Sequence, residues 1–178
     1  IDLDPEFSRA YAGFGFTQFF LYIADPSQAV LDEGLVAANR AIALDAADPF
    51  AYVVLMGLRM RNREPDAAIR AGKWALELNP RDSWANGILG VALVSSGHLE
   101  EGIEHLMIAG QTWGTNPQRG PSLAQLACAH LYLGRYEEAI EWAHRALSIP
   151  TTQFWANMAL TAAHALLGNK EDAGLAAR

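Results

Sequence analysis

Small residues return along this chain of 178 residues at an almost constant interval. Two such sets occur, Gly34, Ala68, Gly102, Ala139 and Ala173, and then Ala41, Ala75, Ala109 and Ala146. Successive members of the first set lie 34, 34, 37 and 34 residues apart. A fixed period of this length is typical of proteins that stack one supersecondary unit many times. The spacing therefore predicts a repeat array.

Each repeat contains two amphipathic segments separated by a short turn. In the third repeat, the apolar pattern that starts at Trp84 stops at Ser95-Ser96-Gly97, and a second pattern starts at Leu99. A connection of about three residues makes the two helices antiparallel. In this repeat, residues 82–111, the two apolar stripes run over 84–93 and 99–109. The other helices expected in chain order are 6–23, 28–44, 49–61, 66–78, 122–133, 136–148, 154–167 and 170 onward.

The turns between paired helices carry their own signals. Gly97, Gly134 and Gly168 are placed to end a helix in the left-handed conformation, and Arg63 takes the glycine's place in one repeat. Ser27 is a plausible N-cap and Pro65 fits a first helical position. Two irregularities are expected to protrude: about seven extra residues in the first repeat, and a glycine- and proline-rich loop over 112–121.

Charge and cysteine usage exclude several classes of function. Thirteen basic and twenty acidic residues give a net charge of -7, which argues against nucleic-acid binding. The one basic cluster, Arg59, Arg61, Arg63, Arg70 and Lys73, is expected to complement a helix C-terminus in solvent. A single cysteine, Cys128, favours a reducing, cytoplasmic location, and no apolar run reaches the ~18 residues of a membrane span.

No motif in the sequence points to catalysis, a cofactor or a metal. Gly13-Phe14-Gly15 lacks the third glycine and the preceding strand of a phosphate-binding loop. Cys128 lies on an apolar helix face, so an inert thiol is expected. His130 and His164 occupy equivalent positions in neighbouring repeats, but carboxylate or cysteine ligands to complete a metal site are not evident.

These residues resemble a tetratricopeptide repeat array. That family pairs a large with a small residue in its first helix, as in Phe14-Gly15, Leu89-Gly90 and Leu126-Ala127, and has alanines at two crossing points of its second helix. The resemblance covers nearly the whole chain. It implies an all-α, right-handed α-solenoid of about five antiparallel helix pairs, with residues 1–178 as a single domain whose last pair is incomplete.

A narrower resemblance concerns the sequence of the fourth repeat over residues 132–139, Tyr-Leu-Gly-Arg-Tyr-Glu-Glu-Ala. It is similar to the C-terminal repeat regions of bacterial class III adenylate or guanylate cyclases and winged-helix regulators. This implies a fragment of a longer bacterial protein that serves as a regulatory or dimerisation module. The partner would then be another region of the same polypeptide or a second copy of the chain.

The first helices of a curved repeat array line its concave side. The residues expected there are mostly apolar and aromatic: Phe16, Phe20, Phe50, Val54, Trp84, Ile88, Trp155 and Met158. The positions that grip a terminal carboxylate in peptide-clamp members of the family carry no charge here. The sequence therefore predicts a non-catalytic scaffold whose groove binds an apolar or amphipathic peptide segment, with no nucleic acid or membrane as partner. The alternative is that much of this stripe packs between the helices as core.

Overall fold

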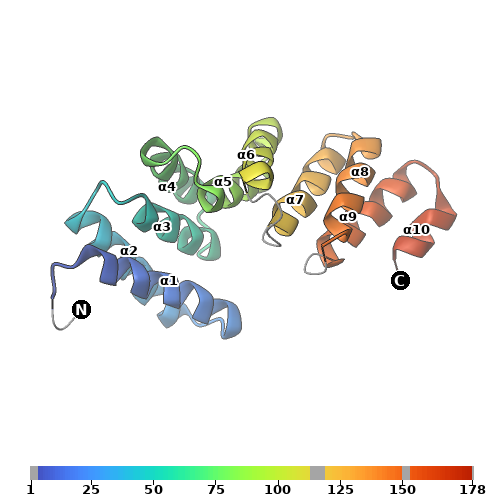
Figure 1. Ribbon diagram of the computed structural model, residues 1–178. Helices are drawn as coiled ribbons and strands as arrows, with labels where there is room; N and C mark the ends of the chain where they lie inside the picture. Colours follow the sequence, from blue (N-terminus) through green and yellow to red (C-terminus); the bar gives the residue numbers. More distant parts are fainter. Residues whose placement is uncertain (1–3, 113–118, 150–152, 178) are drawn as a thin grey trace. The chain divides into compact units, whose positions relative to one another are not determined.

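The computed structural model describes residues 4–112, 119–149 and 153–177, and within them the chain is all-α, with ten helices packed in antiparallel pairs (Figure 1). The helices are α1 (Ser8–Ala24), α2 (Gln28–Leu44), α3 (Pro49–Arg61), α4 (Pro65–Leu78), α5 (Ser83–Ser95), α6 (Leu99–Thr112), α7 (Arg119–Tyr132), α8 (Tyr136–Leu147), α9 (Gln153–Leu166) and α10 (Lys170–Ala176). The predicted fold class is confirmed. None of these helices is long and apolar enough to cross a membrane.

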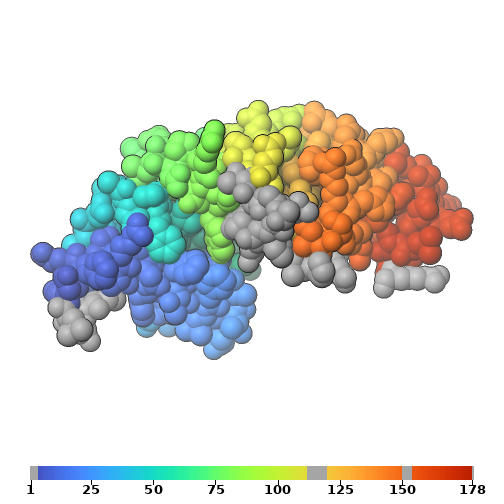
Figure 2. Space-filling view, viewed as in Figure 1, coloured from blue at the N-terminus to red at the C-terminus, as the bar shows by residue number. Residues whose placement is uncertain are grey.

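The chain divides into two compact units, which we call unit 1 (Ile1–Ala92) and unit 2 (Leu93–Arg178). In unit 1, α1 packs against α2 and α3 against α4, while α3 also packs against both helices of the preceding pair. On the face drawn in Figure 2 the blue-to-green atoms of unit 1 form a continuous surface. In unit 2, α7 pairs with α8 and α9 with α10, and α7 also contacts α6 and α9.

The recurring small residues lie where helices cross. All members of the two sets are buried except Ala173 in the last helix, which is partly exposed. At Gly34, an added Cβ would lie 2.9 Å from Leu58 Cδ2, closer than side chains pack. The period seen in the sequence is therefore the period of close helix crossings.

The turns confirm the role of glycine and show what replaces it. Gly97, Gly134 and Gly168 have φ angles of 85°, 73° and 82°, all in the left-handed region. Arg63 adopts the same conformation at φ 59°, at the turn between α3 and α4. Since a side chain with a Cβ is strained there, this arginine holds its turn at a cost that the glycines avoid.

Several predicted boundaries are wrong by a few residues. α1 begins at Ser8, two residues later than expected, with Phe7 at the N-cap. α7 begins at Arg119, so the loop expected over 112–121 does not extend to Pro121, which is tolerated within the first turn of a helix. The rest of that loop, 113–118, lies outside the described residues.

Helix caps differ from expectation in one case. Ser27 is the N-cap of α2, but its hydroxyl makes no capping hydrogen bond. Pro65 does occupy the first turn of α4, and Asp48 caps α3 by accepting a hydrogen bond from the Phe50 amide at 3.1 Å. The extra residues of the first repeat lengthen α1 and α2. These helices have 17 residues each, whereas α3 and α4 have 13 and 14.

Candidate functional site

Aromatic rings from α1, α3 and α5, the first helices of three successive pairs, meet in unit 1. α1 contributes Phe16, Phe19 and Phe20, α3 contributes Phe50 and α5 contributes Trp84; we call these five residues the aromatic face. The Phe16 ring is central, with its centroid 4.9 Å from Phe20, 5.5 Å from Phe50 and 5.9 Å from Trp84. Most of these contacts are edge-to-face, the geometry that the ring quadrupole favours.

The aromatic face is a surface rather than an open slot. The space enclosed by Phe16, Phe19, Val53, Val54, Gly57, Trp84 and Ile88 is only about 10 Å³. A cavity of this size holds at most one water molecule. A ligand therefore has to lie across the rings and cannot insert a side chain between them.

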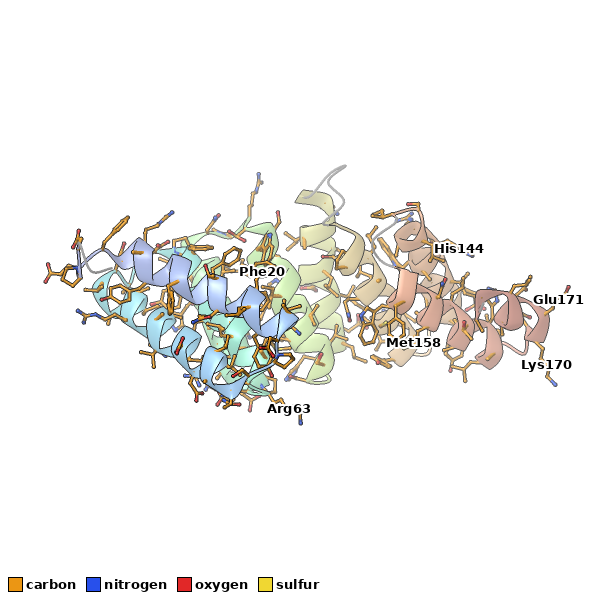
Figure 3. All side chains as sticks on the ribbon, turned by 90° about the horizontal axis from the view of Figure 1, so that it is seen from below. Phe20, Arg63, His144, Met158, Lys170 and Glu171 are labelled. Atoms are coloured by element: carbon orange, nitrogen blue, oxygen red, sulfur yellow. The ribbon has the colours of Figure 1, made fainter. Side chains whose placement is uncertain are left out.

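The rings are partly open to solvent. Phe20 is 46% exposed and projects from α1 (Figure 3), while Phe16, Phe19, Phe50 and Trp84 are half-buried. Such a cluster offers contact area that is already ordered by its own packing. Rigid aromatic side chains of this kind carry much of the binding energy at protein interfaces.

A glycine fixes the position of Phe19. An added Cβ at Gly57 of α3 would lie 3.2 Å from the Phe19 ring, so the ring rests directly on the α3 backbone. One helical turn later, the guanidinium of Arg61 lies 5.3 Å from the centroid of the same ring, which is a cation–π contact. The C-terminal end of α3 thus brings an arginine to the edge of the aromatic face.

At the other end of α3 lies an arginine of α1, Arg9, whose charge is matched. Arg9 Nε lies 2.9 Å from Asp48 Oδ2, and the Asp48 side chain is only 2% exposed. Asp48 simultaneously caps α3 beside Phe50. The Asp48 carboxylate therefore stabilises the fold and is not available to a ligand.

The predicted groove residues fall into three groups in the structure. Phe16, Phe20, Phe50 and Trp84 touch one another, and half-buried Ile88 lies beside Trp84. Val54 is 3% exposed and packs in the core against Leu31, Leu35 and Leu58, so it supports the rings from beneath. Trp155 and Met158 lie on α9 in unit 2, 50% and 37% exposed, with Trp155 packed edge-to-face against Phe154.

The predicted set missed two residues of this site. The sequence places Phe19 among the further apolar positions along the groove but not among its eight binding residues, and it places Arg61 only in a solvent-exposed basic cluster. A signal for both existed: Gly57 and Arg61 are four residues apart, hence on one side of α3, and continue the line of Phe50 and Val53. A glycine inside a helix is itself a sign of close packing.

Two candidate chemical groups that the sequence offers, Cys128 and His130, both lie on α7. Burial raises the pKa of the Cys128 thiol to about 11, so the reactive thiolate is disfavoured. His130 stacks on Trp142 with ring centroids 6.4 Å apart, and burial lowers its pKa. Across the described ranges, no three His, Cys, Asp or Glu side chains gather as metal ligands would.

We compared the chain with known protein families and known protein sequences. Residues 121–149, which contain most of α7 and all of α8, match the tetratricopeptide repeat model. A search of curated protein sequences finds no significant relative.

Solved structures of similar fold are numerous. PilF of Pseudomonas aeruginosa superposes with a TM-score of 0.79 at 18% identity, covering 95% of this chain and 72% of that one. MamA gives 0.72 at 20% identity, covering 84% and 85%. YrrB, described as a TPR protein with an unusual peptide-binding site, gives 0.67 at 20% identity, covering 89% and 76%.

At these identities the structures define the fold and nothing finer. Neither the family match nor these three proteins carries the link to nucleotide cyclases or winged-helix regulators that the narrower sequence resemblance implied. The repeat model and the superpositions agree on the broader assignment. The chain is a protein of tetratricopeptide-repeat fold, with residues 121–149 forming a recognisable tetratricopeptide repeat.

Proposed function

We propose that the chain is a protein-interaction scaffold and that the aromatic face of unit 1 is its binding surface for an apolar or amphipathic peptide segment. Proteins of this fold bind other proteins or peptides, and YrrB is one neighbour described as having a peptide-binding site. The observation that carries the proposal is the contact of five rings on one surface, with Phe20 exposed and the other four rings half-buried.

The chemistry of the face defines the class of ligand. Edges of aromatic rings and apolar side chains offer dispersion contacts and exclude water, but few hydrogen bonds. An amphipathic helix or an extended segment with two or three large apolar side chains would lie across this surface with its apolar side against the rings. On unit 2, Trp155 and Met158 offer exposed apolar side chains, which we include in the proposal.

The test uses random dodecapeptides displayed on phage, selected on the immobilised chain. Peptides rich in Leu, Phe or Trp should be enriched, and Trp84→Ala or Phe20→Ala should weaken their binding about thirtyfold, as expected for aromatic residues that contribute about 2 kcal/mol. Trp74→Ala is the matched control, because Trp74 is a 56% exposed tryptophan on α4 that stacks on Tyr52 outside the face.

The result can contradict the proposal in two ways. Equal loss with Trp74→Ala would place the binding surface elsewhere, and unchanged binding with both face variants would remove the face from recognition. Thermal unfolding of each variant separates lost binding from lost folding. Trp155→Ala, assayed alongside, tests whether the surface on unit 2 contributes.

A further inference from the structure

We infer that the segment bound by the aromatic face carries an acidic side chain beside its apolar residues, and that Arg61 is the group that receives this carboxylate. The inference rests on the proposed function and specifies the chemistry of the ligand. It starts from the position of Arg61, whose guanidinium lies 5.3 Å from the Phe19 ring, while Phe19 packs on Phe20 at 5.3 Å. The positive charge is therefore in direct contact with the apolar surface.

The contact with Phe19 leaves the hydrogen-bonding capacity of Arg61 unused. A guanidinium meets an aromatic ring through its positive charge, while its five N–H donors lie along its edges in the geometry of a carboxylate. Arg61 is exposed, and no carboxylate in the described part of the chain lies within ion-pairing distance of it. Its neighbour Arg59 is different, because it is bonded to Glu64.

The two ends of the aromatic face are consequently unequal. At the Phe50 end, Arg9 is already paired with buried Asp48. At the Phe19 end, Arg61 has no ion pair with any residue that the structure describes. Of these two arginines, only Arg61 is free of an ion pair with a described residue. A carboxylate of the bound segment is therefore received at the Phe19 end, and this gives the segment a direction along α3.

Length and charge support an acidic peptide as the occupant. From Phe50 to Arg61 the helix rises about 16 Å, at ~1.5 Å per residue, which about five residues of an extended segment span. The net charge of -7 does not oppose an acidic ligand here, because charges beyond about 8 Å are largely screened at physiological ionic strength. The Asp48 carboxylate of a second copy is not available to Arg61, because it is buried against Arg9.

The test uses fluorescein-labelled dodecapeptides with blocked termini that share one pattern of Leu and Phe. They differ in a single residue, Glu, Gln or Lys, placed first or last. The wild-type chain should bind the Glu peptide about threefold more tightly than the Gln peptide in one of the two placements, the effect of one well-formed exposed ion pair. R61Q should reduce this Glu-to-Gln ratio to one, and R61E should favour the Lys peptide. Each ratio is taken within one variant, so a general change in affinity does not enter it.

R40Q is the matched control, since the Arg40 guanidinium lies 6.0 Å from the Tyr11 ring on another surface of unit 1. It should keep the wild-type preference for Glu. Melting curves of R61Q and R40Q verify that both variants are folded.

Each other outcome overturns the inference in a distinguishable way. Failure of every peptide, the neutral one included, would remove the proposed function itself. Binding of all peptides without a preference for Glu would remove only the role of Arg61. A preference that survives in R61Q would place the carboxylate elsewhere, and concentration-dependent self-association that R61Q abolishes would make a second copy the occupant.

Discussion

At the scale of single residues, Arg63 departs most from the rest of the chain. It is the one described residue other than glycine with a positive φ, at a turn where three other repeats have glycine, and its side chain extends outward at the edge of unit 1 (Figure 3). Replacing it with glycine should relieve about 1–2 kcal/mol of left-handed strain, less about 0.5–1 kcal/mol for the greater freedom of glycine in the unfolded chain. We expect Arg63→Gly to raise the melting temperature by about 1–3 °C, at ~2–4 °C per kcal/mol for a chain of this size.

Arg63→Ala is the control for this prediction, because alanine removes the guanidinium but keeps a Cβ in the left-handed region. It should give no comparable increase. Equal stabilisation by alanine and glycine would show that repulsion within the basic cluster, not backbone strain, is the cost at this turn.

At the scale of helices, small side chains decide where elements can cross. Ala41 of α2 is fully buried in a cluster with Ala12 and Ala51, and its carbonyl accepts a hydrogen bond from Ser8 Oγ at 3.1 Å. We expect Ala41→Trp to lower the free energy of unfolding by about 1–3 kcal/mol or more, because an added ring cannot be accommodated there. Urea denaturation monitored by circular dichroism measures the change.

Ala43→Trp provides the comparison on the same helix. Ala43 is exposed, so its replacement should stay within about ±0.5 kcal/mol. Similar losses at both positions would mean that helix propensity, rather than crossing distance, determines the effect.

These elements also show how far the sequence could predict the structure. Helix pairing could be predicted from the sequence, because it depends on two signals that the sequence shows directly. These are the repeat period and the glycines at the turns. The ring contacts of Phe16 could be expected only as a shared stripe, since their distances depend on how α1, α3 and α5 pack. The packing of Phe19 on Gly57 and its contact with Arg61 bring together residues about forty positions apart, which periodicity alone does not place.

At the scale of the whole molecule, the chain consists of two compact units. In unit 2, Leu160 packs with Ala127, Cys128, Ala143 and Ala159. Because repeat proteins are stabilised by neighbouring contacts, local damage should remain largely local. We expect Leu160→Ala, which removes about 2–5 kcal/mol of core packing, to reduce amide hydrogen-exchange protection in α7–α9 more than in α1–α3.

Leu58→Ala reverses the experiment, since Leu58 is fully buried in the core of unit 1. Protection should then fall mainly in α1–α3. Equal loss throughout the chain after either substitution would show that the two units open as one cooperative structure.

The single cysteine can serve as a probe of local opening in unit 2. Cys128 lies in the core between α7, α8 and α9, and its thiol is held in the protonated form. A thiol reagent can modify it only when that core opens and water reaches the sulfur. The rate at which Cys128 is alkylated therefore measures how often the core of unit 2 opens. Because the chain has no second cysteine, unit 1 contributes nothing to this rate.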